Sequence, residues 1–186
     1  MTKALDVPVL NTPRMRLRPL SLDDTAAIFD VHSDEETVKY WGHDRMTESA
    51  QAEKLIRENL AGVQSGSSIC WGLERQNPPG LIGTCTLFRF DHQNRHAEVG
   101  YILQRACWGQ GLGSEALAAM IDFAFNTLDL HRLEADTDPR NEASLALLRK
   151  FGFKHEGYFR ERWFVHGQWL DSDMLGLLRS ERVRAN

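Results

Sequence analysis

Apolar and polar residues alternate near the start of the chain, and the pattern then changes to helical spacing. Residues 14–20 (RMRLRPL) predict a strand with Met15 and Leu17 on one face. The S-x-x-D pattern directly after it resembles a capping box and predicts a helix over about residues 21–32. A second helix is expected to begin at Thr47 or Ser49 and to end near Gly62. The chain therefore opens with one strand and two helices.

Three strand-like runs follow these helices. The first two cover residues 68–74 and 81–90, and the sequence NPPG at positions 77–80 between them is a strong turn signal. A polar link then leads into the third run, residues 96–103. We expect three successive strands in this region.

Three glycines at alternate positions, Gly109, Gly111 and Gly113, come shortly after the third of these strands. Glycine adopts backbone conformations that other residues avoid, and it lets another group approach the main chain closely. A helix pattern over residues 114–128 opens directly behind the glycines. A helix N-terminus offers unpaired N–H groups and the positive end of its dipole to an anion. The loop therefore indicates a cradle for a phosphate or pyrophosphate group.

The last part of the chain predicts one more strand and helix and then a terminal hairpin. The strand is expected over residues 132–136, and the helix over residues 143–151 with Asn141 as its N-cap. Two strands, residues 154–164 and 169–178, meet at a His-Gly turn. Taken in order, these elements predict an α/β protein with a mixed sheet and helices on its faces.

Composition agrees with a globular chain that forms a single domain over residues 1–186. The net charge of −4 argues against a nucleic-acid-binding protein, and no apolar run approaches the length of a membrane span. The three cysteines are widely spaced and form no CxxC pair, which is typical of reduced thiols in a cytoplasmic protein. No metal site is expected, because His92 and His96 have no third ligand placed beside them.

The glycine loop is compatible with more than one nucleotide. A Walker loop is excluded because no Lys-Ser/Thr pair follows the glycines. Residues 111–116 (GLGSEA) do match the dinucleotide pattern GxGxxA, and Glu134 ends the next strand, where a ribose-binding acid is found. The turn from Leu103 to Gly111 is long for that motif, however, and too few strands remain for a six-stranded dinucleotide fold. An NAD-binding oxidoreductase stays as a minor alternative.

Taken together, the motifs resemble the GNAT superfamily of acetyl-CoA-dependent N-acetyltransferases. Residues 109–113 (GQGLG) match the signature [Q/R]-x-x-G-x-[G/A] except at its first position, where Trp108 stands. A Trp-Gly pair there is common in the RimJ/RimL-like branch, whose members acetylate protein N-termini and small amines. Further matches are TPRMRLRPLSLDD, AEVGYIL, NEASLALLRKFGF and GYFRERWFVHGQW–D, so the resemblance covers roughly residues 11–178. It implies a mixed, mostly antiparallel sheet of about seven strands with helices on both faces.

The resemblance implies that acetyl-CoA is the co-substrate and that no metal takes part. The backbone N–H groups of the glycine loop would hold its pyrophosphate. Asn141 and Ser144 form an N-x-x-S motif, in which Asn141 would bind the pantetheine arm and Ser144 the sulfur. The expected CoA-binding residues are Tyr101, Ile102, Leu103, Trp108, Gly109, Gln110, Gly111, Leu112, Gly113, Ser114, Asn141 and Ser144.

Acetyl transfer needs a neutral amine and a stabilised thiolate, and the resemblance implies residues for both. An acid on the strand AEVGY serves as general base in related enzymes, and Glu98 matches it; a structural glutamate bound to a neighbouring loop or arginine is the alternative. Many members protonate the thiolate with a tyrosine seven residues after the asparagine, but that position is Leu148 here. Ser144 is therefore expected to donate a hydrogen bond to the thiolate. The alternative to a role in CoA binding is that Asn141 only caps the helix and that Ser144 packs inside it.

We therefore expect an N-acetyltransferase in which a primary amine attacks the thioester directly within a ternary complex. The acceptor is a protein N-terminus or a small amine, and Tyr40, Trp41 and Glu98 are expected to line its pocket. Cys107 lies beside the loop without an obvious histidine base, so no acyl-enzyme is expected. The family also allows a homodimer. The alternative from another class is a CoA-binding interaction module without catalysis.

Overall fold

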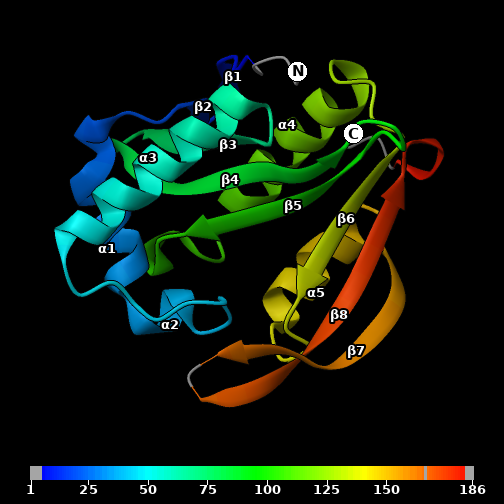
Figure 1. Cartoon of the computed structure of the whole chain (residues 1–186). Coiled ribbons are helices and arrows are strands. Elements are labelled where there is room, and N and C mark those ends of the chain that lie inside the picture. The colour runs from blue at the N-terminus through cyan, green and yellow to red at the C-terminus, as the bar shows by residue number, and fades with distance from the viewer. Residues whose placement is uncertain (1–5, 166, 183–186) are drawn as a thin grey trace.

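The structure, a computed structural model, describes residues 6–165 and 167–182 and is built around one eight-stranded sheet. The strand order is β1-β2-β3-β4-β5-β6-β8-β7 (Figure 1). Neighbouring strands are antiparallel except for the parallel pair β5 and β6. The strands are β1 (Leu10–Asn11), β2 (Met15–Pro19), β3 (Ser68–Gln76), β4 (Pro79–Asp91), β5 (His96–Leu103), β6 (Arg132–Thr137), β7 (Lys154–Val165) and β8 (Gln168–Leu178).

Helices cover both faces of this sheet (Figure 1). On one face α1 packs against α3 and β4, and α3 packs against β3. On the other face α4 packs against β2, β4 and β5. The helices are α1 (Thr25–Ser33), α2 (Glu35–Val38), α3 (Ser49–Ser65), α4 (Leu112–Asn126) and α5 (Glu142–Lys150). The expected α/β architecture with helices on both faces is confirmed.

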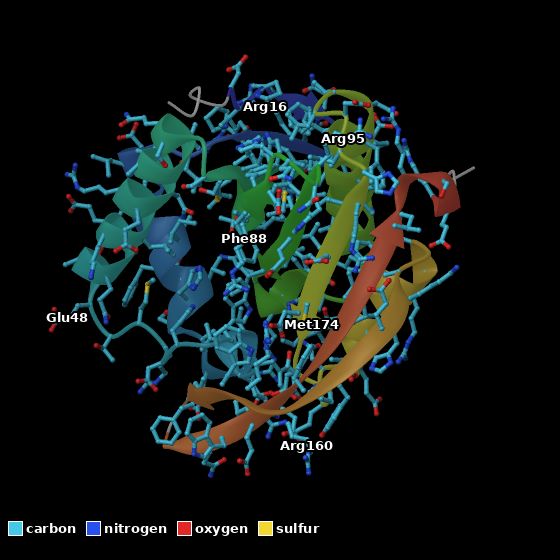
Figure 2. The ribbon with its side chains drawn as sticks, turned by 45° about the vertical axis from the view of Figure 1, so that its right-hand side comes forward. Arg16, Glu48, Phe88, Arg95, Arg160 and Met174 are labelled. Carbon is cyan, nitrogen blue, oxygen red and sulfur yellow. The ribbon has the colours of Figure 1, made fainter. Side chains whose placement is uncertain are left out.

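Two apolar layers hold the helices to the sheet. The larger layer joins α4 and α5 to the sheet and includes Trp71, Leu117 and Phe125, which are at most 1% exposed. The smaller layer joins α1 and α3 to the opposite face through residues such as Ile28 and Ile56. Burying side chains of this size stabilises the fold by roughly 1.5–3 kcal/mol each. Figure 2 shows Phe88 toward the centre of the molecule, whereas Arg16, Glu48, Arg95 and Arg160 lie around its rim.

The seven strands expected from the pattern are present, and two further elements accompany them. Strand β1 has two residues, too few to produce a visible alternation. Helix α2 is a single turn, begun by Asp34, whose Oδ1 accepts the Thr37 N–H at 2.7 Å. The S-x-x-D pattern opens a 3-10 turn before α1, with the Ser21 N–H donating to Asp24 Oδ2 at 2.8 Å. The expected turn after β7 includes His166, which lies outside the described residues.

Helix α3 ends at Ser65, so the expected end near Gly62 is wrong. Gly66 has a φ of 73° and forms the left-handed C-cap that ends the helix. Gly62 lies inside the helix, where a Cβ would come within 2.1 Å of Ser68 Oγ at the start of β3. The glycine at position 62 therefore permits a close approach of the next strand and does not stop the helix.

The sheet splits between β5 and β6. Their parallel pairing covers three residue pairs, the last of them Glu98 with Glu134. Beyond this point the two strands diverge (Figure 1): β5 continues to Leu103 along β4, and β6 continues to Thr137 along β8. Glu98 therefore lies where the gap in the sheet begins.

Candidate active site

The glycine loop forms a sharply bent connection from β5 to α4. A 3-10 turn (Arg105–Cys107) follows β5, and Gly109 and Gly111 then have φ values of 69° and 76°. Other residues are strained in this left-handed region, so the turn requires glycine at both positions. Gly111 is the N-cap of α4, which therefore begins at Leu112 and not at Ser114 as expected. The first N–H groups of the helix have no intrahelical partner and lie at the positive end of its dipole.

Side chains on both sides hold this loop in place. The Trp108 indole Nε1 donates to the Leu103 carbonyl at 2.8 Å, and Arg14 Nη1 donates to the Gln110 carbonyl at 2.8 Å. Arg14 also pairs with Glu115 in the first turn of α4, at 2.7 Å. Burial opposes ionisation of Glu115, but hydrogen bonds from Thr12 and Arg14 outweigh it and lower its pKa. The N-terminal segment thus fixes the loop from behind, a role that the sequence pattern did not reveal.

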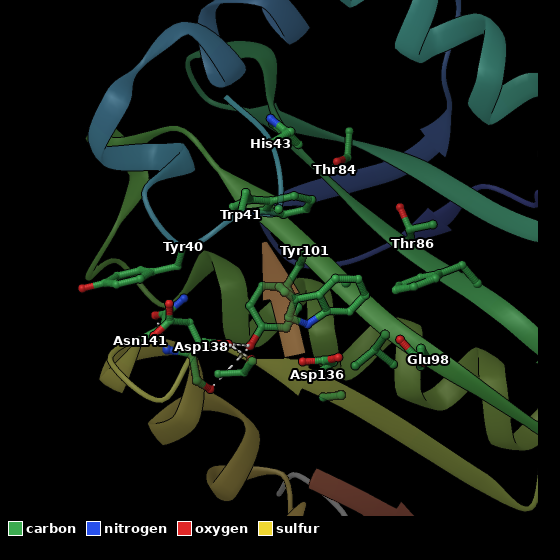
Figure 3. A pocket seen from close by; sticks show the side chains of 18 of the residues that line it. Tyr40, Trp41, His43, Thr84, Thr86, Glu98, Tyr101, Asp136, Asp138 and Asn141 are labelled. Carbon is green, nitrogen blue, oxygen red and sulfur yellow. Dashed lines mark hydrogen bonds between the residues drawn. The ribbon is translucent and has the colours of Figure 1, made fainter. Parts of the chain in front are cut away.

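The N-x-x-S motif forms the N-terminus of α5. Asn141 is the N-cap, because its Oδ1 accepts the Ser144 N–H at 3.1 Å. The Ser144 hydroxyl does not pack inside the helix; it lies 2.8 Å from the hydroxyl of Tyr101 on β5 and 3.4 Å from Thr137 Oγ1 on β6 (Figure 3). Both residues of the motif line the same cavity as Tyr101. Asn141 therefore caps the helix, as one of the two alternatives predicted, while Ser144 faces the cavity.

Glu98 is 7% exposed and forms an ion pair inside the molecule. Arg89 Nη1 donates to both of its carboxylate oxygens, at 2.9 and 3.0 Å. Arg89 has a φ of 52° at an irregular point of the β4–β5 pairing, which brings its guanidinium across to β5. Glu98 therefore has the arginine partner expected of a structural glutamate and also lines the cavity, as a general base must.

The cavity of about 560 Å³ occupies the gap between β5 and β6. Side chains alternate along a strand, so Glu98 on β5 points to the α1 side and Tyr101 to the α4 and α5 side. Ile102 and Val99 confirm this arrangement, since Ile102 packs with α1 and α2 and Val99 with the layer of α4. The split in the sheet lets one cavity reach groups on both of its faces.

The wall on the α1 side is aromatic. Trp41 and His43, in the connection after α2, pack around His32 of α1, with ring centroids 5.3–6.0 Å apart. His32 is 2% exposed, and neither of its ring nitrogens has a hydrogen-bond partner among the described residues. Burial, and then the nearby His43, lower the pKa of His32 to about 4, so its ring is neutral at neutral pH. Tyr40 and Trp41 both line the cavity; in Figure 3 Trp41 lies near His43, whereas Tyr40 lies beside Asn141.

Carboxylates of β6 and β8 complete the cavity on the other side of the gap. Asp136 accepts hydrogen bonds from Arg162 Nε, at 2.9 Å, and from the Ser172 hydroxyl. Asp171 accepts from the Tyr158 hydroxyl and from the Glu161 N–H, and these two bonds lower its pKa. Both carboxylates line the cavity. Asp136 points to the same side as Glu98, because Glu98 pairs with Glu134, whereas Asp171 lies on the face of Asp173 and Leu175.

The structure brings together only part of the expected site. Glu98, Tyr101, Asn141, Ser144, Tyr40 and Trp41 all line the cavity. The side chains of Ile102 and Leu103 are buried in the core, so only their backbone is available to a ligand. The loop from Trp108 to Ser114 lies outside the cavity, but Gly113 approaches Leu147 of α5, and Lys150 Nζ donates to Ser114 Oγ at 3.2 Å.

Several cavity residues carry no signal in the sequence. Arg89, Asp136, Thr137, His32 and His43 come from four separate segments, and none belongs to a motif. Asp136 does end the predicted strand, and the observed strand β6 continues to Thr137. Of the hairpin aromatics, Trp163 lines the cavity, whereas Tyr158 and Phe159 are 51% and 45% exposed.

Other candidate chemistry lies outside the cavity. Cys107 is buried, and its Sγ accepts a hydrogen bond from Arg75 at 3.9 Å. His92 stacks on Phe90, and the residues that the structure describes contain no group of three potential metal ligands. No helix within 6–165 and 167–182 combines the length and apolarity that a bilayer crossing requires. The mostly antiparallel sheet also differs from the parallel sheet of dinucleotide-binding folds, which argues against the NAD-binding alternative.

Known proteins resemble this chain in both sequence and fold. The family model of the acetyltransferase (GNAT) domain matches residues 14–154. The uncharacterized N-acetyltransferase YoaA of Bacillus subtilis (strain 168) is 33% identical over 172 residues, which are 92% of this chain and 97% of that protein. The spermidine N(1)-acetyltransferase of Escherichia coli (strain K12) is 25% identical over 157 residues, which are 83% of this chain and 81% of that protein.

Among solved structures, Mycobacterium smegmatis RimJ in complex with CoA-disulfide superposes with a TM-score of 0.88. Its sequence is 23% identical, and the match covers 100% of this chain and 93% of that chain. The fold, the family match and the curated relatives agree with one another. The chain therefore belongs to the GNAT family and is an acetyltransferase.

Proposed function

We propose that this acetyltransferase uses acetyl-CoA as donor and acetylates a primary amine, either a protein N-terminal α-amine or a small amine, by direct attack in a ternary complex. The observation that supports it most is the cavity, which spans the gap in the sheet and places Glu98 and Ser144 on the two sides of β5. A thioester in the gap would meet an amine from the α1 side and release its sulfur toward α5.

The donor side suits CoA. The N–H groups at the start of α4 and the left-handed glycines Gly109 and Gly111 form a cradle for a diphosphate without a lysine in the loop. Added Cβ atoms would strain both glycines, and at Gly111 a Cβ would also lie 3.4 Å from Arg14. RimJ of Mycobacterium smegmatis, a protein with the same fold, was solved with CoA-disulfide. Asn141 and Ser144 then face the pantetheine arm and the thioester.

The acceptor side suits a cationic amine. Glu98 and Asp136 line it, and the cations paired with them are Arg89 and Arg162. Asp171 also lines the cavity, where a hydroxyl and a backbone N–H donate to it and the charges of Arg160 and Arg140 help to lower its pKa. One relative is named for spermidine, a polyamine, which agrees with an acidic pocket. The rings of Trp41 and His43 supply the apolar wall for the rest of the acceptor.

In the proposed reaction Glu98 takes a proton from the acceptor ammonium and passes it to water, and the neutral amine then attacks the thioester carbon. Glu98 takes the second proton, which the nitrogen loses as the amide forms. The carbon–sulfur bond breaks, and the electron pair goes to the sulfur, which Ser144 stabilises through a hydrogen bond. Arg89 Nη1 holds the Glu98 carboxylate in place through its two hydrogen bonds. Cys107 takes no part, because it lies outside the cavity.

Calorimetry and thiol release test this proposal together. We expect acetyl-CoA and CoA to bind the purified enzyme and NADH not to bind. With acetyl-CoA present, thiol release should occur with members of a panel of N-terminal peptides, polyamines and amino-acid conjugates. Absence of heat with either CoA compound contradicts the proposal for the donor, and binding without thiol release for any amine favours a CoA-binding module.

A further inference from the structure

Two hydroxyl groups from distant parts of the chain meet on the donor side of the cavity. Tyr101 Oη, from the middle of β5, lies 2.8 Å from Ser144 Oγ in the first turn of α5. The Ser144 carbonyl is 3.5 Å from the same phenol, and Thr137 Oγ1 is 3.4 Å from Ser144 Oγ. Figure 3 shows Tyr101 reaching across the gap toward the end of β6 and the start of α5.

Either hydroxyl could donate in this pair, and the acceptors around the phenol favour the phenol as donor. Burial raises the pKa of Tyr101 to about 12, although the hydrogen bond with Ser144 opposes the shift, so the phenol keeps its proton at neutral pH. The phenol has one proton and two candidate acceptors, and Oγ at 2.8 Å has the better geometry than the carbonyl at 3.5 Å. Ser144 Oγ accepts that proton, and its own proton is then free to point elsewhere.

The hydroxyl proton of Ser144 has one weak protein acceptor besides the phenol. Thr137 Oγ1 at 3.4 Å is a weak acceptor at the limit of hydrogen bonding. The Ser144 N–H is already bonded to Asn141, which fixes the turn that carries the hydroxyl. The serine proton therefore has the open cavity as its alternative to Thr137.

We propose that Tyr101 is a positioning residue: by donating to Ser144 Oγ, it aims the Ser144 proton at the sulfur that leaves the thioester. The inference rests on the proposed function, since it needs a CoA sulfur in the cavity. Many family members have a tyrosine at the position that Leu148 occupies in α5. In this chain the phenol near the leaving group comes from β5 instead. The phenol acts through Ser144 and does not touch the sulfur itself.

The two hydroxyls stabilise the thiolate by hydrogen bonding and not by giving up a proton. When nitrogen bonds to the acetyl carbon, the carbon–sulfur bond breaks and sulfur takes the electron pair, while Glu98 holds the proton from nitrogen. Transfer of the Tyr101 proton would move it from a group with a pKa of about 12 to a thiol near 8.5, which is unfavourable by roughly a thousandfold. The thiolate is therefore protonated from water after release.

The thiol of bound CoA provides a direct test. Thiolate absorbance against pH gives the pKa of the thiol in the complex, without any acceptor or turnover. We expect this pKa to be lowest in the wild type and higher in Tyr101→Phe and in Ser144→Ala. Because one hydrogen bond to a charged group is at stake, Tyr101→Phe should also reduce kcat about tenfold with little change in KM. In a Ser144→Ala background, Tyr101→Phe should have no further effect.

Two controls separate positioning from a purely structural role. Tyr158→Phe removes an equally hydrogen-bonded phenol on β7, and it should leave the thiol pKa unchanged. Ser144→Thr keeps a hydroxyl and should retain the low thiol pKa. An equal thiol pKa in wild type and Tyr101→Phe, or an equal loss of kcat with and without Ser144, would overturn the inference. Failure of every variant and of the wild type to bind CoA would instead overturn the proposed function.

Discussion

The two sides of β5 are built in different ways. On the donor side, the glycine loop, the Asn141 cap and the Ser144 hydroxyl come from compact motifs at two helix N-termini. On the acceptor side, Glu98 meets side chains from the segment after α2, from β6 and from the hairpin. Backbone groups and helix caps suit a donor that stays the same. Side chains from separate segments can each be substituted, so they suit an acceptor that varies between enzymes. The comparison implies that substitutions on one side should leave the other side's affinity intact.

The largest effect is expected at Glu98, on the acceptor side. Glu98→Gln removes the proton acceptor but keeps the shape of the side chain, and turnover should fall by about 10²–10⁴-fold while CoA affinity stays the same. Initial rates and calorimetry measure the two quantities. Arg89→Gln is the matched variant, because it leaves Glu98 in place and removes its partner. A small loss of turnover accompanied by a large loss of thermal stability in Glu98→Gln would assign Glu98 a structural role.

The aromatic wall should make the stability of the enzyme sensitive to acid. His32 has a pKa of about 4 in the folded protein and about 6.5 when unfolded. Above pH 6.5 both states are neutral; as the pH falls toward 4 only the unfolded chain binds the proton, so the free energy of unfolding should decrease. The loss should reach up to about 3 kcal/mol and then level off. Urea unfolding between pH 7 and 4.5 measures it.

A comparison of two histidine variants shows whether His32 causes this loss of stability in acid. His32→Phe keeps a ring but cannot titrate, and it should lose less stability between pH 7 and 4.5 than the wild type. His131→Gln, at an exposed histidine beside β6, should follow the wild-type pH profile. If the wild type and His32→Phe show the same profile, the buried ring is not the source of the sensitivity.

On the donor side, Gly111→Ala should weaken CoA binding. A side chain in the left-handed region costs about 1–2 kcal/mol, which corresponds to a loss of affinity of roughly 5–30-fold if the loop shifts to relieve it. Gly167→Ala is a matched control, because Gly167 has a φ of 73° with nothing within 4 Å, far along the chain in the hairpin. Calorimetry with CoA should detect the loss in Gly111→Ala alone, and equal affinities would remove the loop from the donor site.

The smallest effect is expected from Trp41 on the acceptor wall. Trp41→Ala removes one ring of the wall, and the KM for the acceptor should rise about fivefold, since one aromatic contact contributes about 0.5–1.5 kcal/mol. The dissociation constant of CoA should not change. Trp169→Ala is the control, because Trp169 is 60% exposed and lies outside the cavity. A weaker CoA complex in Trp41→Ala would show that the two sides are coupled.

Local patterns predicted most elements, because alternation and helical spacing reflect burial directly. They failed where an element was too short to show a period, as in β1 and α2, and where a glycine had a tertiary role, as Gly62 does beside Ser68. Phe164 on β7 and Trp169 on β8 are about 60% exposed, because this end of the hairpin extends past the residues of β8 that pair with β6.

The sequence by itself predicted the residues of the proposed donor side, since the glycine spacing and the N-x-x-S motif are local and both lie at helix N-termini. It also placed Glu98 on the central strand. Only the tertiary structure decided that β5 and β6 separate after Glu98, so that one cavity reaches both faces of the sheet. It also decided that Arg89 binds Glu98 and that Tyr101 meets Ser144, 43 residues along the chain. Such contacts depend on how distant segments pack, and no local pattern records them.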